Sequence, residues 1–139
     1  MFFQKYTPLL ARTAIAVIFI HSGIGKLSDF AATQAQIASA GLPLAPLVTV
    51  FTIAFLWLGS LSLILGYKAR IGAGLLLAFL IPATLVFHNP IVDPTQMIQF
   101  LKNLSIIGGL LMVAVYGSGP VSLDRRIAAP SPYPGESVR

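Results

Sequence analysis

The residues best suited to chemistry are cationic and hydrogen-bonding side chains near the ends of long apolar segments. Three such segments place five of them at a common depth: His21, Lys26, His88, Lys102 and Asn103. Their nitrogen atoms can hold a ligand oxygen, so together they could bind a quinone or a lipid head. Alternatively, they cap helix ends and stabilise a bundle. The sequence leaves both interpretations open.

Other kinds of site find less support. Two histidines on separate segments lack a third ligand at a telling spacing, and the chain has no cysteine, so we predict no metal site and no thiol chemistry. No aspartate or glutamate lies inside an apolar segment, which argues against a conventional proton or sodium relay. Phosphate-binding loops, dinucleotide fingerprints and nucleophile motifs are missing as well. We therefore assign no catalytic residue and expect no intrinsic catalytic activity.

A further cation, Arg12, lies about one helical turn inside the first apolar segment. Membrane arginines commonly extend towards the lipid headgroups, and we expect such a lipid or headgroup contact here. In the alternative, the guanidinium points inward and binds an anionic headgroup or a ligand oxygen.

Four apolar segments of membrane-spanning length must position these side chains. We place them at about residues 9–25, 46–66, 71–88 and 103–121, since roughly 17–25 apolar residues cross the hydrocarbon core. Hydrophobic residues make up 56% of the 139-residue chain and charged residues only 9%, against about 25% charged in soluble domains. The predicted fold is an all-α membrane protein, an antiparallel bundle of four transmembrane helices.

Local signals refine this fold. Asp29 can cap a helix in the first connector and Gly41 can end it, which predicts a short interfacial helix between spans one and two. Pro82 removes a backbone hydrogen bond and predicts a kink in the third span. The domain is expected over residues 1–126, and the proline-rich tail 127–139 is predicted to be disordered.

Lysine and arginine are unevenly distributed between the two ends of such a bundle. The end with both termini has seven, namely Lys5, Arg12, Lys68, Arg70, Arg125, Arg126 and Arg139, and the other end has two, Lys26 and Lys102. Because cytoplasmic loops carry the excess of these residues, we expect both termini in the cytoplasm. The basic residues flank apolar segments, so the expected partners are the lipid bilayer and other membrane subunits or a second copy, and no nucleic acid.

Several stretches resemble the DoxX family of membrane proteins, in particular its small inner-membrane members. The resemblance covers about residues 8–126 and is carried by Arg12, 21–27 (HSGIGKL), 41–43 (GLP), 65–70 (LGYKAR), 100–105 (FLKNLS) and 117–126 (GSGPVSLDRR).

The resemblance implies a four-helix bundle in a bacterial inner membrane with cytoplasmic termini. It also implies a link to redox chemistry, since the family name comes from a subunit of a quinol oxidase or thiosulfate:quinone oxidoreductase. Family members often carry a glutamate in the second span where this chain has Leu56. If that glutamate serves proton or quinone chemistry, this chain lacks it.

Three functions follow from these observations. The first is a non-catalytic accessory or assembly subunit of a membrane redox or respiratory complex. The second is a quinone- or lipophile-binding oxidoreductase subunit that uses the five residues named at the outset, with quinone as the one cofactor considered. The third is a small-molecule carrier. Large subunits that co-purify would support the first function, and a bound quinone would support the second.

Overall fold

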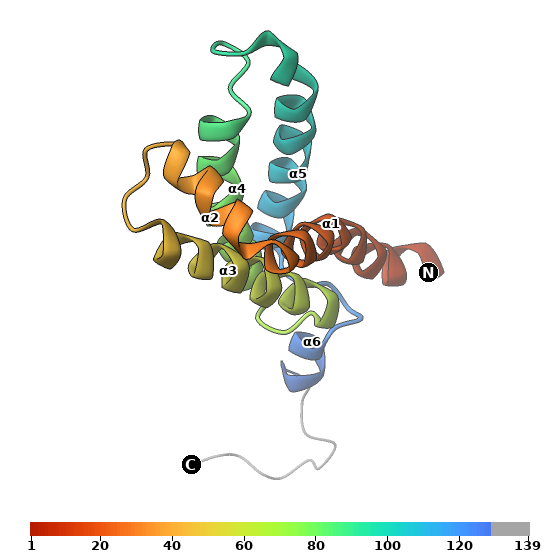
Figure 1. Cartoon of the computed structure of the whole chain (residues 1–139). Helices are drawn as coiled ribbons and strands as arrows, with labels where there is room; N and C mark the ends of the chain where they lie inside the picture. Colours follow the sequence, from red (N-terminus) through yellow and green to blue (C-terminus); the bar gives the residue numbers. More distant parts are fainter. Residues whose placement is uncertain (129–139) are drawn as a thin grey trace.

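A computed structural model describes residues 1–128 of the chain, and these residues form helices and no strand. The helices, in chain order (Figure 1), are α1 (Phe2–Ser28), α2 (Phe30–Ser39), α3 (Ala45–Leu65), α4 (Ala69–Phe87), the short 3₁₀ helix η1 (Pro94–Gln96), α5 (Met97–Tyr116) and α6 (Leu123–Ala128). Four of them, α1, α3, α4 and α5 together with η1, are long and apolar enough to cross a membrane. The prediction of an all-α protein with four membrane spans is confirmed.

The four long helices alternate in direction. At one end of the bundle, Arg12 of α1 contacts Leu63 near the end of α3 and Val121 after α5. At the other end, the last turns of α1 and α4 and the first turns of α3 and α5 surround one cavity. We call the first the terminal end and the second the pocket end.

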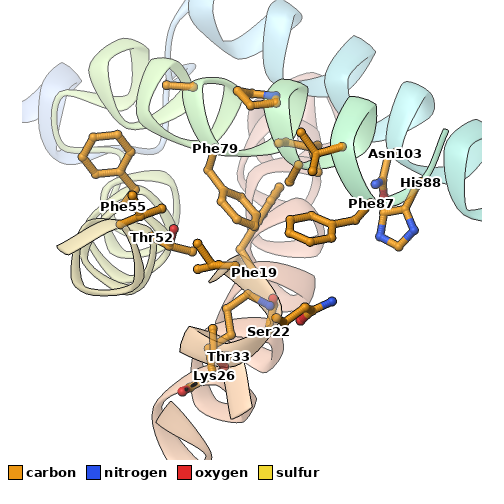
Figure 2. Close-up of a pocket in the computed structure, with 18 of the residues that line it drawn as sticks. Phe19, Ser22, Lys26, Thr33, Thr52, Phe55, Phe79, Phe87, His88 and Asn103 are labelled. Atoms are coloured by element: carbon orange, nitrogen blue, oxygen red, sulfur yellow. Dashed lines mark hydrogen bonds between the residues drawn. The ribbon is translucent and has the colours of Figure 1, made fainter. Parts of the chain in front are cut away.

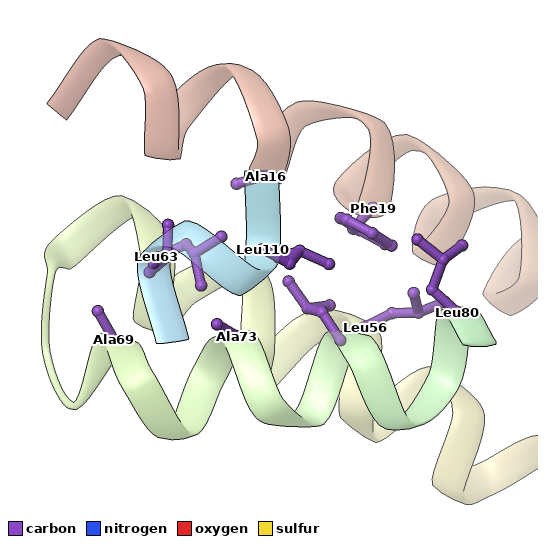
Figure 3. Packing of buried hydrophobic residues seen from close by; sticks show 10 residues of the cluster. Ala16, Phe19, Leu56, Leu63, Ala69, Ala73, Leu80 and Leu110 are labelled. Carbon is purple, nitrogen blue, oxygen red and sulfur yellow. The ribbon is translucent and has the colours of Figure 1, made fainter. Parts of the chain in front are cut away.

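The core lies where α3 packs against α1 and α4, with α5 packed on α4. Figure 3 shows its buried side chains, which are Ala16, Phe19, Leu56, Leu63, Ala69, Ala73, Leu76, Leu80, Leu110 and Val113. Two glycines lie within the α3–α4 contact. A Cβ atom on Gly59 would lie 2.5 Å from Cγ of Leu76, and one on Gly72 would lie 2.3 Å from Oγ of Ser62. Glycine at both positions lets the two helix backbones approach each other.

Large apolar side chains also cover the outer faces of the bundle. Leu10, Leu61, Leu85 and Leu104, one from each long helix, are all exposed. Such surfaces are unfavourable in water and are favourable against lipid chains. The outer faces therefore fit a hydrocarbon environment.

The short helix predicted between the first two spans is present as α2. Oδ1 of Asp29 accepts a hydrogen bond from the backbone N–H of Ala32 at 3.1 Å, which caps the helix. Gly41 follows the helix with φ of 82°, a left-handed conformation that favours glycine after a helix end. Thr33 and Ile37 are buried, and α2 packs against α3. Its expected position on the membrane surface stays a prediction.

Some boundaries differ from the prediction. The first helix begins at Phe2 rather than near residue 9, and the last span ends at Tyr116, before Gly117 with its φ of 79°. A short helix, α6, was not expected, and it includes two residues of the predicted tail, Ile127 and Ala128. The rest of that tail, 129–139, lies outside the described residues. Pro82 lies inside α4, and the kink expected there stays a prediction.

Candidate functional site

A cavity of about 570 Å³ lies at the pocket end, between α1, α2, α3, α4 and α5. Sites for small molecules usually measure roughly 300–1,000 Å³, so the cavity is large enough for one. All five residues predicted from their depth line it, namely His21, Lys26, His88, Lys102 and Asn103. The structure thus brings these residues together, and their role in binding a ligand stays a prediction.

The lining of the cavity is mostly aromatic and aliphatic. Five of the nine phenylalanines in the chain contribute to it, namely Phe19, Phe51, Phe55, Phe79 and Phe87. In Figure 2, Ser22, Lys26 and Thr33 lie together on one side, and His88 lies with Asn103 on another. Phe87 lies beside His88, and Phe79 lies further along the cavity towards Phe55. An apolar cavity with a few polar groups at its edges is typical of a site for a lipophilic molecule with a polar head.

On one polar side, a hydrogen bond to Gln96 orients the ring of His88. Its Nδ1 lies 2.7 Å from Oε1 of Gln96. Because a glutamine Oε1 atom can only accept, Nδ1 must carry the hydrogen and donate it. In the neutral ring, Nε2 then holds a free lone pair. This nitrogen can accept a hydrogen bond from a ligand hydroxyl.

Asn103, beside His88, is held by a chain of hydrogen bonds into α4. Its Nδ2 donates to Oγ1 of Thr84 at 3.0 Å, and that hydroxyl donates to the carbonyl oxygen of Leu80 at 2.7 Å. Asn103 and Thr84 are both buried. The amide therefore has a fixed position, and its Oδ1 and its second N–H remain available for further hydrogen bonds.

The other polar side is formed by α1 and α2. Lys26, half-buried in the last turn of α1, lies with Ser22 and with Thr33 and Gln36 of α2. The hydroxyl of Thr33 donates to the carbonyl oxygen of Asp29 at 3.0 Å, so its proton is already engaged. These four residues and His21 also line a second, shallow cavity of about 380 Å³ next to the first, which is largely open to the outside. We call the larger cavity the inner cavity and the smaller one the outer cavity.

Arg12 belongs to neither cavity. It is 1% exposed and lies at the terminal end, where Nη1 donates to the carbonyl oxygen of Leu63 and Nη2 to that of Val121 at 2.7 Å. The expected contact with lipid headgroups does not fit this geometry, because the guanidinium is enclosed by protein. The inward alternative describes the orientation, with backbone carbonyls in place of a ligand oxygen. Arg12 ties the end of α3 to the segment after α5.

Asp124, which the sequence did not single out, completes this end of the bundle. The N-terminus of α4 has no capping side chain of its own. Asp124, which is 55 residues away from Ala69 in the sequence, caps this helix instead. Its Oδ1 accepts a hydrogen bond from the N–H of Lys68 at 2.7 Å, and its Oδ2 accepts one from the N–H of Ala69 at 3.2 Å. Its own N–H donates to the carbonyl oxygen of Gly66 at 2.9 Å. The missing local cap on the third span was the signal that could have indicated such a partner.

The charge of Asp124 is stabilised by these contacts. Burial alone would raise the pKa of its carboxyl group. The hydrogen bonds from Lys68 and Ala69 and the positive charge of Arg12 act in the opposite direction, and they hold the pKa below its usual value. The carboxylate also lies where the partial positive charge of the α4 N-terminus favours an anion. Asp124 is therefore a structural anion.

Comparison with known proteins gives matches along most of the chain. The DoxX family model matches residues 7–89, and the SURF4 family model matches residues 61–127. The inner membrane protein YqjF of Escherichia coli is 32% identical over 119 residues, which cover 84% of this chain and 88% of YqjF. The inner membrane protein YphA of the same species is 33% identical over 124 residues, which cover 85% of this chain and 88% of YphA.

A more distant match extends to eukaryotes. The ER-derived vesicles protein ERV29 of Saccharomyces cerevisiae is 33% identical over 81 residues, which cover 55% of this chain and 26% of ERV29. No solved structure matches the chain. The two bacterial relatives span both the terminal end and the pocket end.

Proposed function

The chain belongs to the DoxX family of integral membrane proteins, and we propose that it binds a lipophilic molecule with a polar head in its inner cavity. In this proposal it serves a membrane redox assembly as an accessory subunit and catalyses no reaction itself. Two of its relatives are inner membrane proteins of Escherichia coli, and its four apolar helices fit the same kind of membrane.

The inner cavity is the observation that carries the proposal. Phenylalanines form its middle, and hydrogen-bonding groups from α1, α2, α4 and α5 lie at its sides. The backbone carbonyl oxygen of Ala78 is one more polar group, because Pro82 leaves it without its usual helical hydrogen bond. Because proline has no N–H, it cannot bond to the carbonyl oxygen of Ala78, and both residues line the cavity. A ligand with a polar head and an apolar body would satisfy these groups and fill the aromatic space.

A role without catalysis is supported by Leu56. The family resemblance implies a glutamate at this place in many members, whereas Leu56 is fully buried among apolar side chains. No proton can be exchanged at this position. A quinone would suit the His88–Asn103 side, where Asn103 has an N–H to donate to a quinone oxygen and His88 has a lone pair to accept from a quinol hydroxyl.

Filling the inner cavity should remove the bound molecule. Ala83 lines the cavity on α4, so the variant Ala83→Trp would place an indole ring inside it. Leu85→Trp is the matched control, because Leu85 is exposed and lies on the same helix but outside the cavity lining. Native mass spectra of protein extracted in mild detergent should show a bound lipophile for the wild type and for Leu85→Trp, and none for Ala83→Trp.

Both variants must keep their helical circular dichroism and their unfolding temperature for this comparison to count. The same bound mass in Ala83→Trp would place the ligand elsewhere. A wild-type spectrum without any bound lipophile, also after incubation with a short-chain quinone, would contradict the proposed function.

We further propose that the terminal end faces the cytoplasm. The excess of lysine and arginine at this end supports this orientation, because six of these residues among positions 1–128 lie there, against Lys26 and Lys102 at the pocket end. A reporter fused to the end of the chain should then be active only as a cytoplasmic reporter, and one inserted beside Asp93 only as a periplasmic reporter. A periplasmic signal from the C-terminal fusion would contradict the orientation. With this orientation, the cavities lie in the periplasmic half of the membrane.

A further inference from the structure

We infer that the ligand of the inner cavity is an anionic amphiphile, whose acidic head lies beside Lys26 and whose chain lies among the phenylalanines. This inference rests on the proposed function and deepens it, because it names the chemistry of the molecule that the cavity holds. The head could be the carboxylate of a fatty acid or the phosphate of a single-chain lipid, which share a negatively charged oxygen group on an acyl chain.

The position of Lys26 between two different cavities is the first observation. It lines both of them, together with His21, Ser22, Thr33 and Gln36. The inner cavity contains five phenylalanines, and the outer cavity contains none. A molecule that is polar at one end and apolar along the rest of its length fits this arrangement, with its head at the boundary and its chain in the inner cavity.

The sign of the charge is the second observation. The residues lining the inner cavity include Lys26, Lys102 and both histidines, with no aspartate or glutamate among the described residues. The outer cavity has one acid, Asp29, which already accepts the N–H of Ala32 as the cap of α2. A lysine at the edge of an apolar space is stabilised more by an anion, which adds charge attraction to the hydrogen bond, than by a neutral oxygen acceptor.

The neighbouring donors suit an anion of low charge. The hydroxyl of Ser22 and the amide of Gln36 lie beside Lys26 in both cavities, and each can donate one or more hydrogen bonds. Thr33 cannot donate to the ligand, because its proton is bonded to the carbonyl oxygen of Asp29. One lysine with two neutral donors matches a carboxylate or a phosphodiester, which carries a single negative charge.

Charge removal at Lys26 tests the inference. Binding of palmitate, lysophosphatidylglycerol and the uncharged hexadecanol would be titrated by native mass spectrometry on delipidated full-length protein. Lys26→Gln should weaken binding of at least one anionic probe by about tenfold, and Lys26→Arg should restore most of it. Hexadecanol should bind more weakly than the anions and respond little to either variant. Lys5→Gln, at the terminal end, is the matched control and should leave the affinity for all three probes unchanged.

The outcomes separate the possible sources and the two proposals. Loss of palmitate binding alone indicates a fatty carboxylate, and loss of lysophosphatidylglycerol binding alone indicates a lipid phosphate. If Lys26→Gln binds both anions as tightly as the wild type while Ala83→Trp binds neither, this inference is wrong and the proposed function stands. If hexadecanol or a short-chain quinone binds as tightly as the anions, the ligand is neutral and the inference is also wrong. Binding that survives Ala83→Trp overturns the inference together with the proposed function.

Discussion

Replacing Arg12 with glutamine should lower the free energy of unfolding by about 3 kcal/mol or more, because it removes two charge-assisted hydrogen bonds inside the protein. A glutamine side chain is shorter and has a single NH₂ group, so it cannot reach the carbonyl oxygens of both Leu63 and Val121. Each carbonyl that loses its donor in a buried place adds to the loss.

Thermal unfolding of the detergent-solubilised protein, followed by circular dichroism, measures this effect. Arg126→Gln is the control, because Arg126 is exposed on α6 and its side chain makes none of these contacts. The unfolding temperature of Arg12→Lys should lie between those of Arg12→Gln and Arg126→Gln. Lysine keeps the positive charge but lacks the planar guanidinium group that reaches two acceptors. An unfolding temperature of Arg12→Gln equal to that of Arg126→Gln would show that the hydrogen bonds of Arg12 to Leu63 and Val121 do not stabilise the fold.

Gly66→Ala should have a similarly large effect, about 3 kcal/mol, from two independent causes. Gly66 has a φ of 66°, a left-handed conformation that costs other residues about 1–2 kcal/mol. In addition, a Cβ atom there would lie 2.5 Å from Cβ of Ser122 and 2.6 Å from Nη1 of Arg12. The methyl group would push against the segment after α5 and displace the arginine from its acceptors.

Two other glycines separate these causes. Gly41 also has a positive φ, 82°, but no heavy atom lies within 4 Å of the position of its Cβ. Gly41→Ala should therefore show the backbone penalty alone. Gly74, inside α4, has open space and no positive φ, so Gly74→Ala should be neutral or should stabilise the protein by up to about 1 kcal/mol. If Gly66→Ala costs no more than Gly41→Ala, the close packing at the terminal end contributes nothing to stability.

The fold could be predicted because its signals are local. The length of an apolar segment determines whether it can span a membrane, so each span can be recognised from its own residues without the rest of the fold. The short helix α2 was equally accessible, since Asp29 and Gly41 are cap residues that act within a few positions in the chain. Boundaries were less certain, because the ends of the first and last spans carry no comparably strict signal.

For the candidate site, the sequence predicts the depth of each residue in the membrane but not the direction in which its side chain points. Depth along a helix follows from position in the segment, and depth alone placed Lys26, His88 and Asn103 at one end of the bundle. The rotation of each helix about its axis depends on tertiary packing, and the sequence does not reveal it. For this reason the inward direction of Arg12 and the aromatic lining of the cavity became visible only in the structure. Asp124 was missed because its partners, Lys68 and Ala69, lie 56 and 55 residues away.

The same long separations set an order of events during synthesis. The acceptors of Arg12 lie 51 and 109 residues further along the chain. When α1 leaves the ribosome and enters the membrane, neither carbonyl has yet been made, so the guanidinium must stay with water or lipid phosphates. The second acceptor, on Val121, exists only after the last span has been translated. The first helix can therefore reach its final depth and rotation only after α5 and the segment that contains Val121 have been synthesised, because Arg12 gains its second acceptor only then.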